Sequence, residues 1–272
     1  MDLEKWYLDA VFADGTVWFG YRARLRLCGC ASIAWCSGCE VLPDGTERRV
    51  SAWRNSPAPR LEEGSWSWTG PDGFRGRWTP SVASKSLVLA ADDQLQVRWN
   101  CVAPRALIER SRDGGRRNGD NVLLAGRGPE RTTRGVGYLE CLRLQSSRST
   151  LPFRELRWGR AHVGESSLVW LRWGQGRDLS LVLEDGLPSS GNIETLADGG
   201  LCIRTEESCW ETGAGRILCN RDVRRSFPGW LVWLTGGLAP AQELKIAGAI
   251  RQRNSVGVER AGSGIWEEVR WE

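Results

Sequence analysis

The chain has only one histidine, His162, among its 272 residues. Any imidazole chemistry is therefore confined to one position. A metal site built on histidines is excluded as well, because zinc sites need three or four ligands. Lysine is also scarce, and Lys5, Lys85 and Lys245 are the only three. No block rich in Lys and Arg with interleaved aromatic residues is present, so we expect no nucleic-acid partner.

Several sequence signatures are missing. The chain has no G-x-S-x-G elbow, no P-loop and no G-x-G-x-x-G that follows a strand, so hydrolases, nucleoside triphosphatases and Rossmann enzymes lack their residues and we expect no cofactor. No run approaches 18 apolar residues, which predicts no membrane span. The N-terminal MDLEKWYLDAVF does not read as a signal peptide. We therefore expect a cytoplasmic protein whose nine cysteines stay reduced.

Tryptophan, in contrast, is abundant, with 16 residues. Trp158, Trp170 and Trp173 surround His162 in the sequence. Aromatic ring faces attract positive charge by ~0.5–2 kcal/mol each, so a cavity walled by them suits apolar or cationic guests. We expect His162 in a loop or edge strand, where a histidine can donate or accept a proton or orient a carboxylate. The alternative is a hydrogen-bonded structural histidine.

The chain is expected to be β-rich almost throughout. Asp-Gly between alternating apolar residues is a strong hairpin signal, because both residues tolerate a positive φ. A short turn of helix is expected only at 103–110 and 151–156. The Asp-Gly pairs are Asp14-Gly15, Asp44-Gly45, Asp72-Gly73, Asp113-Gly114, Asp185-Gly186 and Asp198-Gly199.

A polar, Gly/Arg-rich segment at 111–134 divides the chain into two halves of similar size. Its composition is typical of a linker. Many short strands separated by turns favour sandwiches or barrels. We therefore expect two β-barrel-like domains, an N-terminal one at 1–118 and a C-terminal one at 119–272.

Two strands repeat an aromatic-x-carboxylate spacing. Tyr7 and Asp9 share one face of the first strand, and Tyr138 and Glu140 share one face of a strand in the second half, because side chains alternate with a period of two. A carboxylic acid that burial keeps protonated can donate a proton at pH 7. The alternatives are a solvent-facing Asp9 and a buried Glu140 that pairs with an arginine.

Cys28, Cys30, Cys36 and Cys39 have the spacing C-x-C-x5-C-x2-C, which offers four thiolates for zinc. The neighbouring residues instead favour two adjacent strands, in which the cysteines fill small core positions. We therefore expect no metal at this cluster.

Several short motifs resemble the lipocalin-like superfamily of carotenoid hydratases (hydroxyneurosporene synthases), which is similar to tocopherol cyclase and to fungal Diels–Alderases. They are Glu4-Lys5-Trp6-Tyr7-Leu8-Asp9 with the Asp14-Gly15 hairpin, Gly137-Tyr138-Leu139-Glu140, Trp158-Gly159-Arg160-Ala161-His162 leading to Ser167-Leu168-Val169-Trp170, and Gly264-Ile265-Trp266-Glu267-Glu268-Val269-Arg270-Trp271. The resemblance implies an all-β fold of two tandem lipocalin-like antiparallel β-barrels. It also implies cofactor-independent chemistry on a polyene, prenylated or polyketide substrate. In that chemistry a buried acid protonates an alkene, and water or an internal nucleophile captures the cation.

On this basis we expect a cyclase or hydratase of natural-product biosynthesis, including [4+2] cycloaddition, with a hydrophobic small molecule as its partner. Asp9 or Glu140 would supply the proton and His162 would orient or reprotonate it. The expected substrate-binding residues are Tyr7, Trp18, Tyr138, Trp158, Trp170, Trp173 and Trp266. The alternatives are a non-catalytic carrier of a hydrophobic ligand, which needs only apolar walls with a few polar groups, and a structural zinc protein. The sequence does not indicate an oligomeric state.

Overall fold

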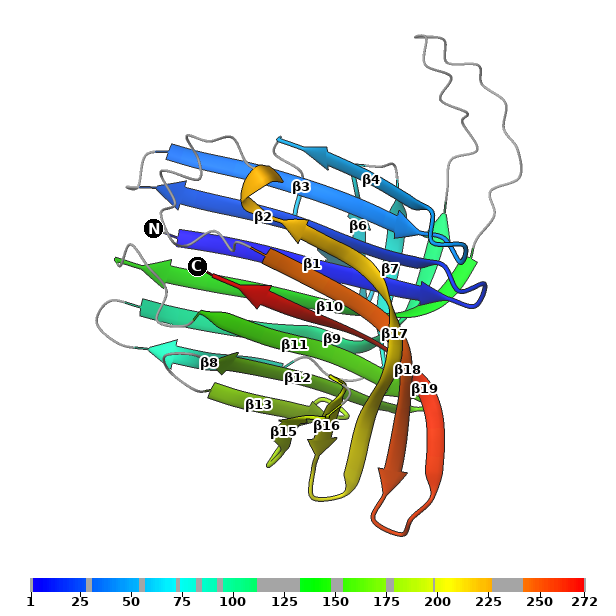
Figure 1. Ribbon diagram of the computed structural model, residues 1–272. Coiled ribbons are helices and arrows are strands. Elements are labelled where there is room, and N and C mark those ends of the chain that lie inside the picture. The colour runs from blue at the N-terminus through cyan, green and yellow to red at the C-terminus, as the bar shows by residue number, and fades with distance from the viewer. Residues whose placement is uncertain are drawn as a thin grey trace. The chain divides into compact units, whose positions relative to one another are not determined.

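The computed structural model describes residues 2–27, 31–53, 57–71, 74–81, 85–91, 95–111, 133–147, 154–174, 179–197, 199–226 and 242–271 (Figure 1). Across these ranges the chain is almost entirely strand, and the only helix is a single 3₁₀ turn, η1 (Arg224–Ser226). The predicted all-β fold is confirmed. Within the same ranges no helix has the length and apolar character that a membrane span requires.

Ten strands form the first antiparallel sheet, in the order β4-β3-β2-β1-β10-β9-β7-β6-β5, with β8 paired to β9. Their bounds are β1 (Asp2–Phe12), β2 (Val17–Leu27), β3 (Ala31–Val41), β4 (Glu47–Ala52), β5 (Arg60–Glu62), β6 (Ser65–Thr69), β7 (Arg75–Pro80), β8 (Lys85–Ala91), β9 (Leu95–Ser111) and β10 (Thr133–Ser146).

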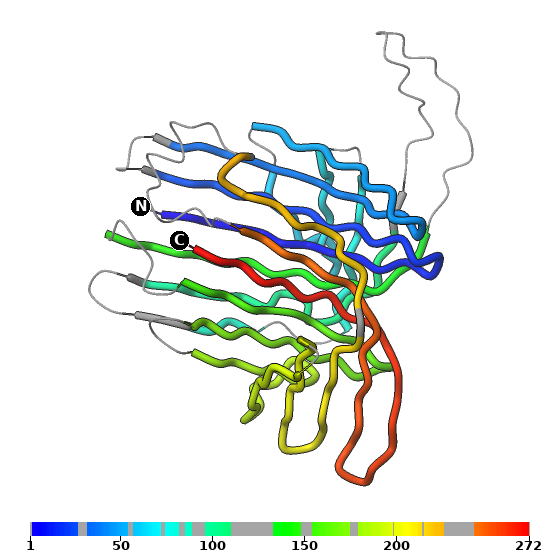
Figure 2. Tube along the Cα trace, in the orientation of Figure 1, coloured from blue at the N-terminus to red at the C-terminus, as the bar shows by residue number. Residues whose placement is uncertain are grey.

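Nine strands form the second antiparallel sheet, in the order β14-β13-β12-β11-β19-β18-β17-β16-β15. Their bounds are β11 (Glu155–Val163), β12 (Ser166–Gly174), β13 (Leu179–Glu184), β14 (Leu187–Ser189), β15 (Asn192–Thr195), β16 (Leu201–Arg204), β17 (Ser208–Asp222), β18 (Gln242–Asn254) and β19 (Glu259–Arg270). Figure 2 shows β17, β18 and β19 bending along their length. The register of β17 against β18 shifts twice along this stretch, and such bulges bend a strand.

The chain divides into two compact units, and each contains most or all of one sheet. The first comprises Met1–Val88 and Val97–Gln145, and the second comprises Leu89–Gln96 and Ser146–Glu272. The main division therefore follows Gln145, rather than the predicted position between 118 and 119. The reason is that β10, which lies after the Gly/Arg-rich segment, pairs with β1 from Asp2↔Gln145 to Phe12↔Gly135.

Each sheet has one face packed into its own hydrophobic core. In the first unit Trp6, Leu8 and Ala10 of β1 belong to the core, and Trp18 of β2 lies with them. The second core is formed in part by Ala161, Val163, Leu168, Trp170 and Trp266. Since side chains alternate along a strand, residues such as Tyr7 and His162 lie on the opposite face of their sheets.

The helical turn expected at 103–110 is wrong, because this segment forms part of β9. Ala106 and Ile108 are fully buried, whereas Leu107 between them is 58% exposed. That alternation with a period of two is the pattern of a strand. The other expected turn, at 151–156, lies partly outside the described residues, and its last two residues begin β11.

The Asp-Gly signals mark hairpins wherever both residues are described. Asp14-Gly15 joins β1 to β2, Asp44-Gly45 joins β3 to β4, and Asp185-Gly186 joins β13 to β14. Only the last pair has two positive φ angles, 48° and 75°, as a type I′ turn requires. Asp72-Gly73, Asp113-Gly114 and Asp198 lie outside the described residues.

Candidate functional site

The register of β1 against β10 brings the two aromatic-x-carboxylate motifs together. Tyr7 lies directly opposite Glu140, and Asp9 lies directly opposite Tyr138. Directly opposed residues share a face of the sheet, so all four side chains project from the face opposite the first core. The tyrosine of each motif therefore lies opposite the carboxylate of the other motif. We refer to Tyr7, Asp9, Tyr138 and Glu140 as the crossed pairs.

Within the crossed pairs each tyrosine donates a hydrogen bond to a carboxylate. The Tyr7 hydroxyl donates to Asp9 Oδ2 at 3.0 Å, and the Tyr138 hydroxyl donates to Glu140 Oε2 at 2.7 Å. Trp99 of β9 donates its indole N–H to the same oxygen of Glu140. Tyr7, Asp9 and Tyr138 are at most 1% exposed, so phenols take the place of water as hydrogen-bond donors to these carboxylates.

Burial controls the protonation of the groups around Glu140. Desolvation raises the pKa of Tyr138 well above its ordinary value, and the nearby Cys101 and Glu140 raise it further. The pKa of the Cys101 thiol is also raised, first by burial and then by the neighbouring Glu140 carboxyl group. Both groups consequently stay protonated at neutral pH, and Tyr138 remains a hydrogen-bond donor.

Aromatic rings adjoin the crossed pairs. The Tyr7 ring lies 5.1 Å from that of Tyr21 and 6.2 Å from that of Tyr138, centroid to centroid. The Lys5 ammonium lies 4.7 Å from the centroid of Tyr21, which is cation–π geometry. This face of the sheet therefore combines two carboxylates with electron-rich ring faces.

Gly137 allows β10 to approach the backbone of Asp9 closely. A Cβ at position 137 would lie 2.1 Å from the Asp9 carbonyl oxygen and 2.2 Å from Ile108 Cδ1. From the core side, the Trp78 indole N–H donates to the same carbonyl oxygen at 3.1 Å. The backbone that carries Asp9 is thus held from both sides, which positions its carboxylate.

A second buried polar cluster lies in the second unit, on the face of β11 opposite the core. Trp158, Arg160 and His162 alternate on this face and are at most 7% exposed. His162 is therefore inside a central strand, paired with β12 and β19, and the prediction of a loop or edge strand is wrong.

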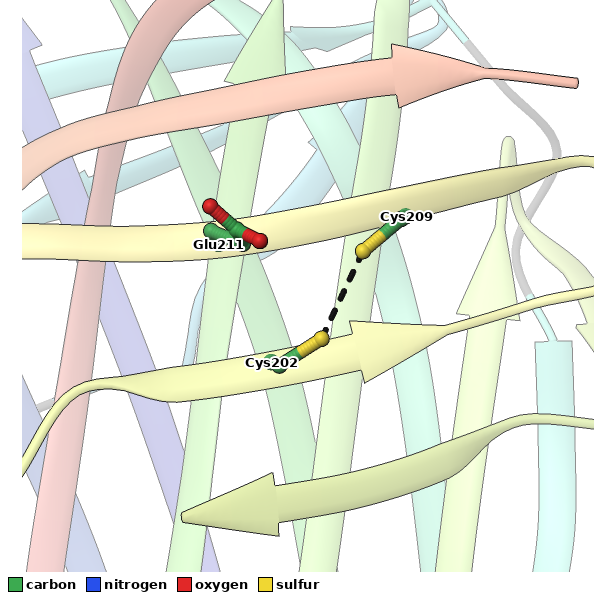
Figure 3. Close-up of side chains that lie close together, drawn as sticks. All are labelled: Cys202, Cys209 and Glu211. Carbon is green, nitrogen blue, oxygen red and sulfur yellow. Dashed lines mark hydrogen bonds between the residues drawn. The ribbon is translucent and has the colours of Figure 1, made fainter. Parts of the chain in front are cut away.

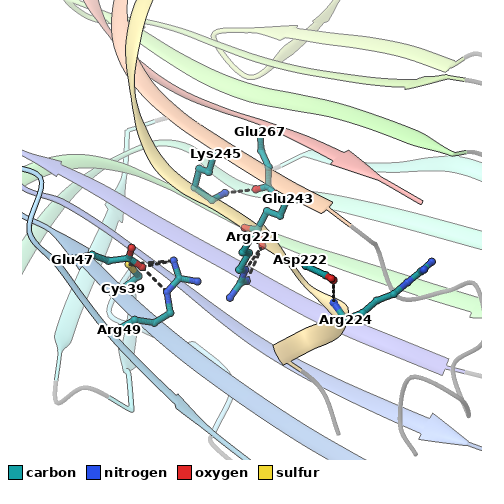
Figure 4. Close-up of polar contacts among 9 residues, drawn as sticks. All are labelled: Cys39, Glu47, Arg49, Arg221, Asp222, Arg224, Glu243, Lys245 and Glu267. Carbon is teal, nitrogen blue, oxygen red and sulfur yellow. Dashed lines mark hydrogen bonds and ion pairs between the residues drawn. The ribbon is translucent and has the colours of Figure 1, made fainter. Parts of the chain in front are cut away.

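Lys245 and Glu267 complete this cluster. Glu267 of β19 lies opposite both Trp158 of β11 and Lys245 of β18. The Lys245 ammonium pairs with Glu267, and it lies 5.1 Å from the Trp158 ring centroid. Both charged groups are at most 2% exposed, and Figure 4 shows their contact together with the Arg221–Glu243 pair.

The predicted tryptophans are divided between the two faces of the sheets. Trp158 and Trp173 lie on the polar face of the second sheet, because Trp158 opposes Leu171 and Trp173 follows Leu171 by two residues. Trp18, Trp170 and Trp266 instead fill the two hydrophobic cores. Trp18, for example, stacks on Phe74 at 3.7 Å. The structure therefore places these three away from the face that carries the predicted acids or His162.

The sequence analysis did not identify Trp99, Arg160, Lys245 or Glu267 as candidate site residues. Lys245 carried a usable signal, because it is one of three lysines and stands inside the otherwise apolar Leu244-Lys245-Ile246-Ala247. A charged residue within a strand that is buried on both faces is almost always paired.

Two cavities in the described part of the chain lie elsewhere. One of about 490 Å³ in the first unit is lined by β5–β7 residues that include Trp68, Arg75 and Arg77. Another of about 180 Å³ in the second unit is lined by residues that include Glu184, Ser208 and Gln252. Neither contains a predicted site residue, so we base the candidate site on the buried polar clusters.

The N-terminal cysteines are only partly described. Cys28 and Cys30 lie outside the described residues, whereas Cys36 and Cys39 are buried thiols of β3. Cys36 belongs to the first core. Burial raises the pKa of Cys39 to about 12, and its sulfur contacts Glu47 and Arg49 (Figure 4).

No protein-family model and no curated protein sequence matches the chain. Solved structures similar to it include kievitone hydratase from Nectria haematococca, at 8% identity and a TM-score of 0.55 over 98% of this chain and 88% of that chain. An AttH-type protein from Nitrosomonas europaea has 13% identity and a TM-score of 0.54 over 98% of this chain and 92% of its own. CghA has 12% identity and a TM-score of 0.53 over 99% and 88%.

At these identities the similarity establishes the fold and not the reaction. It extends over nearly the full length of this chain and most of each neighbour. Together with the two curled antiparallel half-barrel sheets, it confirms the architecture that the sequence resemblance implied. The chain folds as two tandem lipocalin-like domains.

Proposed function

We propose that the protein is a cofactor-independent enzyme that hydrates or cyclises a hydrophobic small molecule, with its acid at the crossed pairs. The observation that carries the proposal is a pair of carboxylates, the buried Asp9 and the partly buried Glu140, each of which accepts a hydrogen bond from a tyrosine on the sheet face opposite the core. A hydratase among the proteins of the same fold supports the reaction class. The sequence lacks the fingerprints of nucleotide cofactors, which is consistent with acid–base chemistry by side chains.

The proposed reaction begins with proton transfer from the carboxylic acid of Asp9 or Glu140 to an alkene carbon. The π electrons form the new C–H bond, and a carbocation is left on the adjacent carbon. The tyrosine hydroxyl already donates to the carboxyl oxygen, so this hydrogen bond strengthens as negative charge develops there. Water or an internal nucleophile then captures the cation, and a proton released at that step restores the acid.

Aromatic faces stabilise the cation in this scheme. Tyr7 and Tyr138 flank the acids and offer electron-rich ring faces on the same face of the sheet. His162, Trp158 and Trp173 belong to the second unit, and their expected roles in the reaction stay predictions from the sequence, which the variant His162→Ala tests. In a pericyclic reaction the same groups would only hydrogen-bond a substrate carbonyl, and their removal would cost less.

The test measures turnover of a panel of polyene and prenylated compounds by Asp9→Asn, Glu140→Gln and His162→Ala. A general acid contributes about 10²–10⁴-fold, so loss of the acid should lower kcat/KM by that factor. Glu62→Gln, at an exposed carboxylate of β5, is the matched control and should retain the wild-type rate. If all three site variants stay folded and turn over substrate normally, the proposed site is wrong and the carrier function is favoured.

A further inference from the structure

Two thiols and a carboxylate converge on one face of the second sheet, outside the clusters described above. The sulfurs of Cys202 on β16 and Cys209 on β17 are 3.4 Å apart. Glu211 lies opposite Cys202 in the register, and it shares a face of β17 with Cys209, two residues away. One ligand atom from each of the three residues lies within 4.8 Å of the other two (Figure 3).

The charged residues around the cluster leave the Glu211 carboxylate available as a ligand. Within the described part of the chain, the Glu211 side chain makes no hydrogen bond or ion pair, although Arg251 of β18 lies opposite it in the register. Two arginines influence this cluster electrostatically, and each already has a carboxylate partner: Arg204 pairs with Glu194, and Arg253 pairs with Glu259.

We propose that Cys202, Cys209 and Glu211 bind a divalent cation of the zinc class, with two sulfur ligands and one carboxylate oxygen. Thiolates and carboxylates both bind zinc, at about 2.3 Å and about 2.0–2.2 Å respectively. Two sulfurs on a tetrahedral zinc are about 3.8 Å apart, so the observed pair needs only a small adjustment. The fourth position is left for water or an exogenous ligand, because Cys209 and Glu211 are only partly buried.

The carboxylate distinguishes this arrangement from a disulfide precursor. A dithiol that forms a disulfide needs only the two sulfurs in suitable geometry. Glu211 would have no part in that reaction, yet its carboxylate lies beside both thiols. Binding would instead release the thiol protons and place the cation between three anionic ligands, which the nearby arginines help to stabilise.

The experiment titrates the reduced, chelator-treated full-length protein with Co²⁺, whose thiolate charge-transfer absorption reports sulfur ligation, and then displaces it with Zn²⁺. The expected result is one sulfur-ligated ion per chain. Cys202→Ser and Cys209→Ser should abolish the sulfur signal of this site. Glu211→Gln should weaken binding at least about tenfold, since losing even an outer-shell partner costs about 10–100-fold. Cys219→Ser, at another buried thiol of β17, is the matched control and should bind as the wild type does.

Three outcomes would overturn the proposal. The first is an absence of sulfur-ligated Co²⁺ in the wild type. The second is binding that persists unchanged in Cys202→Ser and Cys209→Ser, which would place the ion at other cysteines. The third is a Cys202–Cys209 disulfide in protein purified without reductant, found by peptide mass mapping, together with no metal binding after reduction.

Discussion

The fully buried Tyr138 hydroxyl donates a hydrogen bond to Glu140. Burial raises the pKa of this phenol and keeps it protonated. The Glu140 carboxyl oxygen also accepts the Trp99 indole N–H. Two donors on one oxygen fix the orientation of the carboxyl group. At the scale of single residues, the position of the proposed acid is therefore set by its hydrogen-bond donors.

Tyr138→Phe should destabilise the protein by about 1–3 kcal/mol, because it removes one of the two hydrogen bonds that a partly buried carboxyl oxygen accepts. It should also lower turnover, since the developing carboxylate loses a stabilising hydrogen bond. The free energy of unfolding is measured by urea denaturation. Ser32→Ala, which removes an exposed hydrogen bond from Arg24, is the control and should change stability by less than about 0.5 kcal/mol. An effect of Tyr138→Phe no larger than that of the control would contradict the assigned role.

The sequence predicted that the tyrosine and the carboxylate of each motif share a face of a strand. It did not predict that the two motifs lie opposite each other. A spacing of two residues places Tyr7 and Asp9 on one face whatever the fold. The crossing of Tyr7 with Glu140 depends on the register between strands more than 120 positions apart in the chain, about which local patterns carry no information. For the same reason Trp18 was expected in the pocket, although the register places it on the core face.

At the scale of elements, the central feature is the pairing of β1 with β10. The Gly/Arg-rich segment before β10 lies mostly outside the described residues, and its composition did not indicate which sheet the next strand would join. That choice depends on long-range pairing, so the predicted boundary at 118/119 differs from the division after Gln145. The hairpins, in contrast, depend on local turn chemistry, and the sequence therefore predicted them well.

Gly137→Ala tests the close approach of β10 to Asp9. The new methyl group would lie 2.1 Å from the Asp9 carbonyl oxygen, so a backbone shift is required. Such overpacking costs about 1–3 kcal/mol, and the shift should lower turnover by displacing the Asp9 carboxylate. Gly213→Ala in β17 is the control, because its Cβ meets nothing nearer than 3.4 Å. Equal stability and activity of the two variants in urea denaturation and turnover assays would refute this packing argument.

At the scale of the whole molecule, the chain consists of two units, each built around its own sheet, with its own core and its own polar cluster on the opposite face of that sheet. The first contains the crossed pairs. The second contains Trp158, Arg160, His162 and the Lys245–Glu267 pair. The family resemblance predicted this two-domain architecture from short motifs. Tertiary pairing of Lys245 with Glu267 was not predictable, because the two residues lie on different strands.

The central claim is that the enzyme protonates a carbon atom of its substrate, and turnover in D₂O tests it most directly. For a substrate found in the panel, the account predicts one solvent deuterium bound to carbon in each product molecule, detected by mass spectrometry after exchangeable sites are returned to H₂O. Protonation at an alkene carbon requires this label for both hydration and cation cyclisation. Product formed at the normal rate without carbon-bound deuterium would contradict the account and indicate a pericyclic reaction.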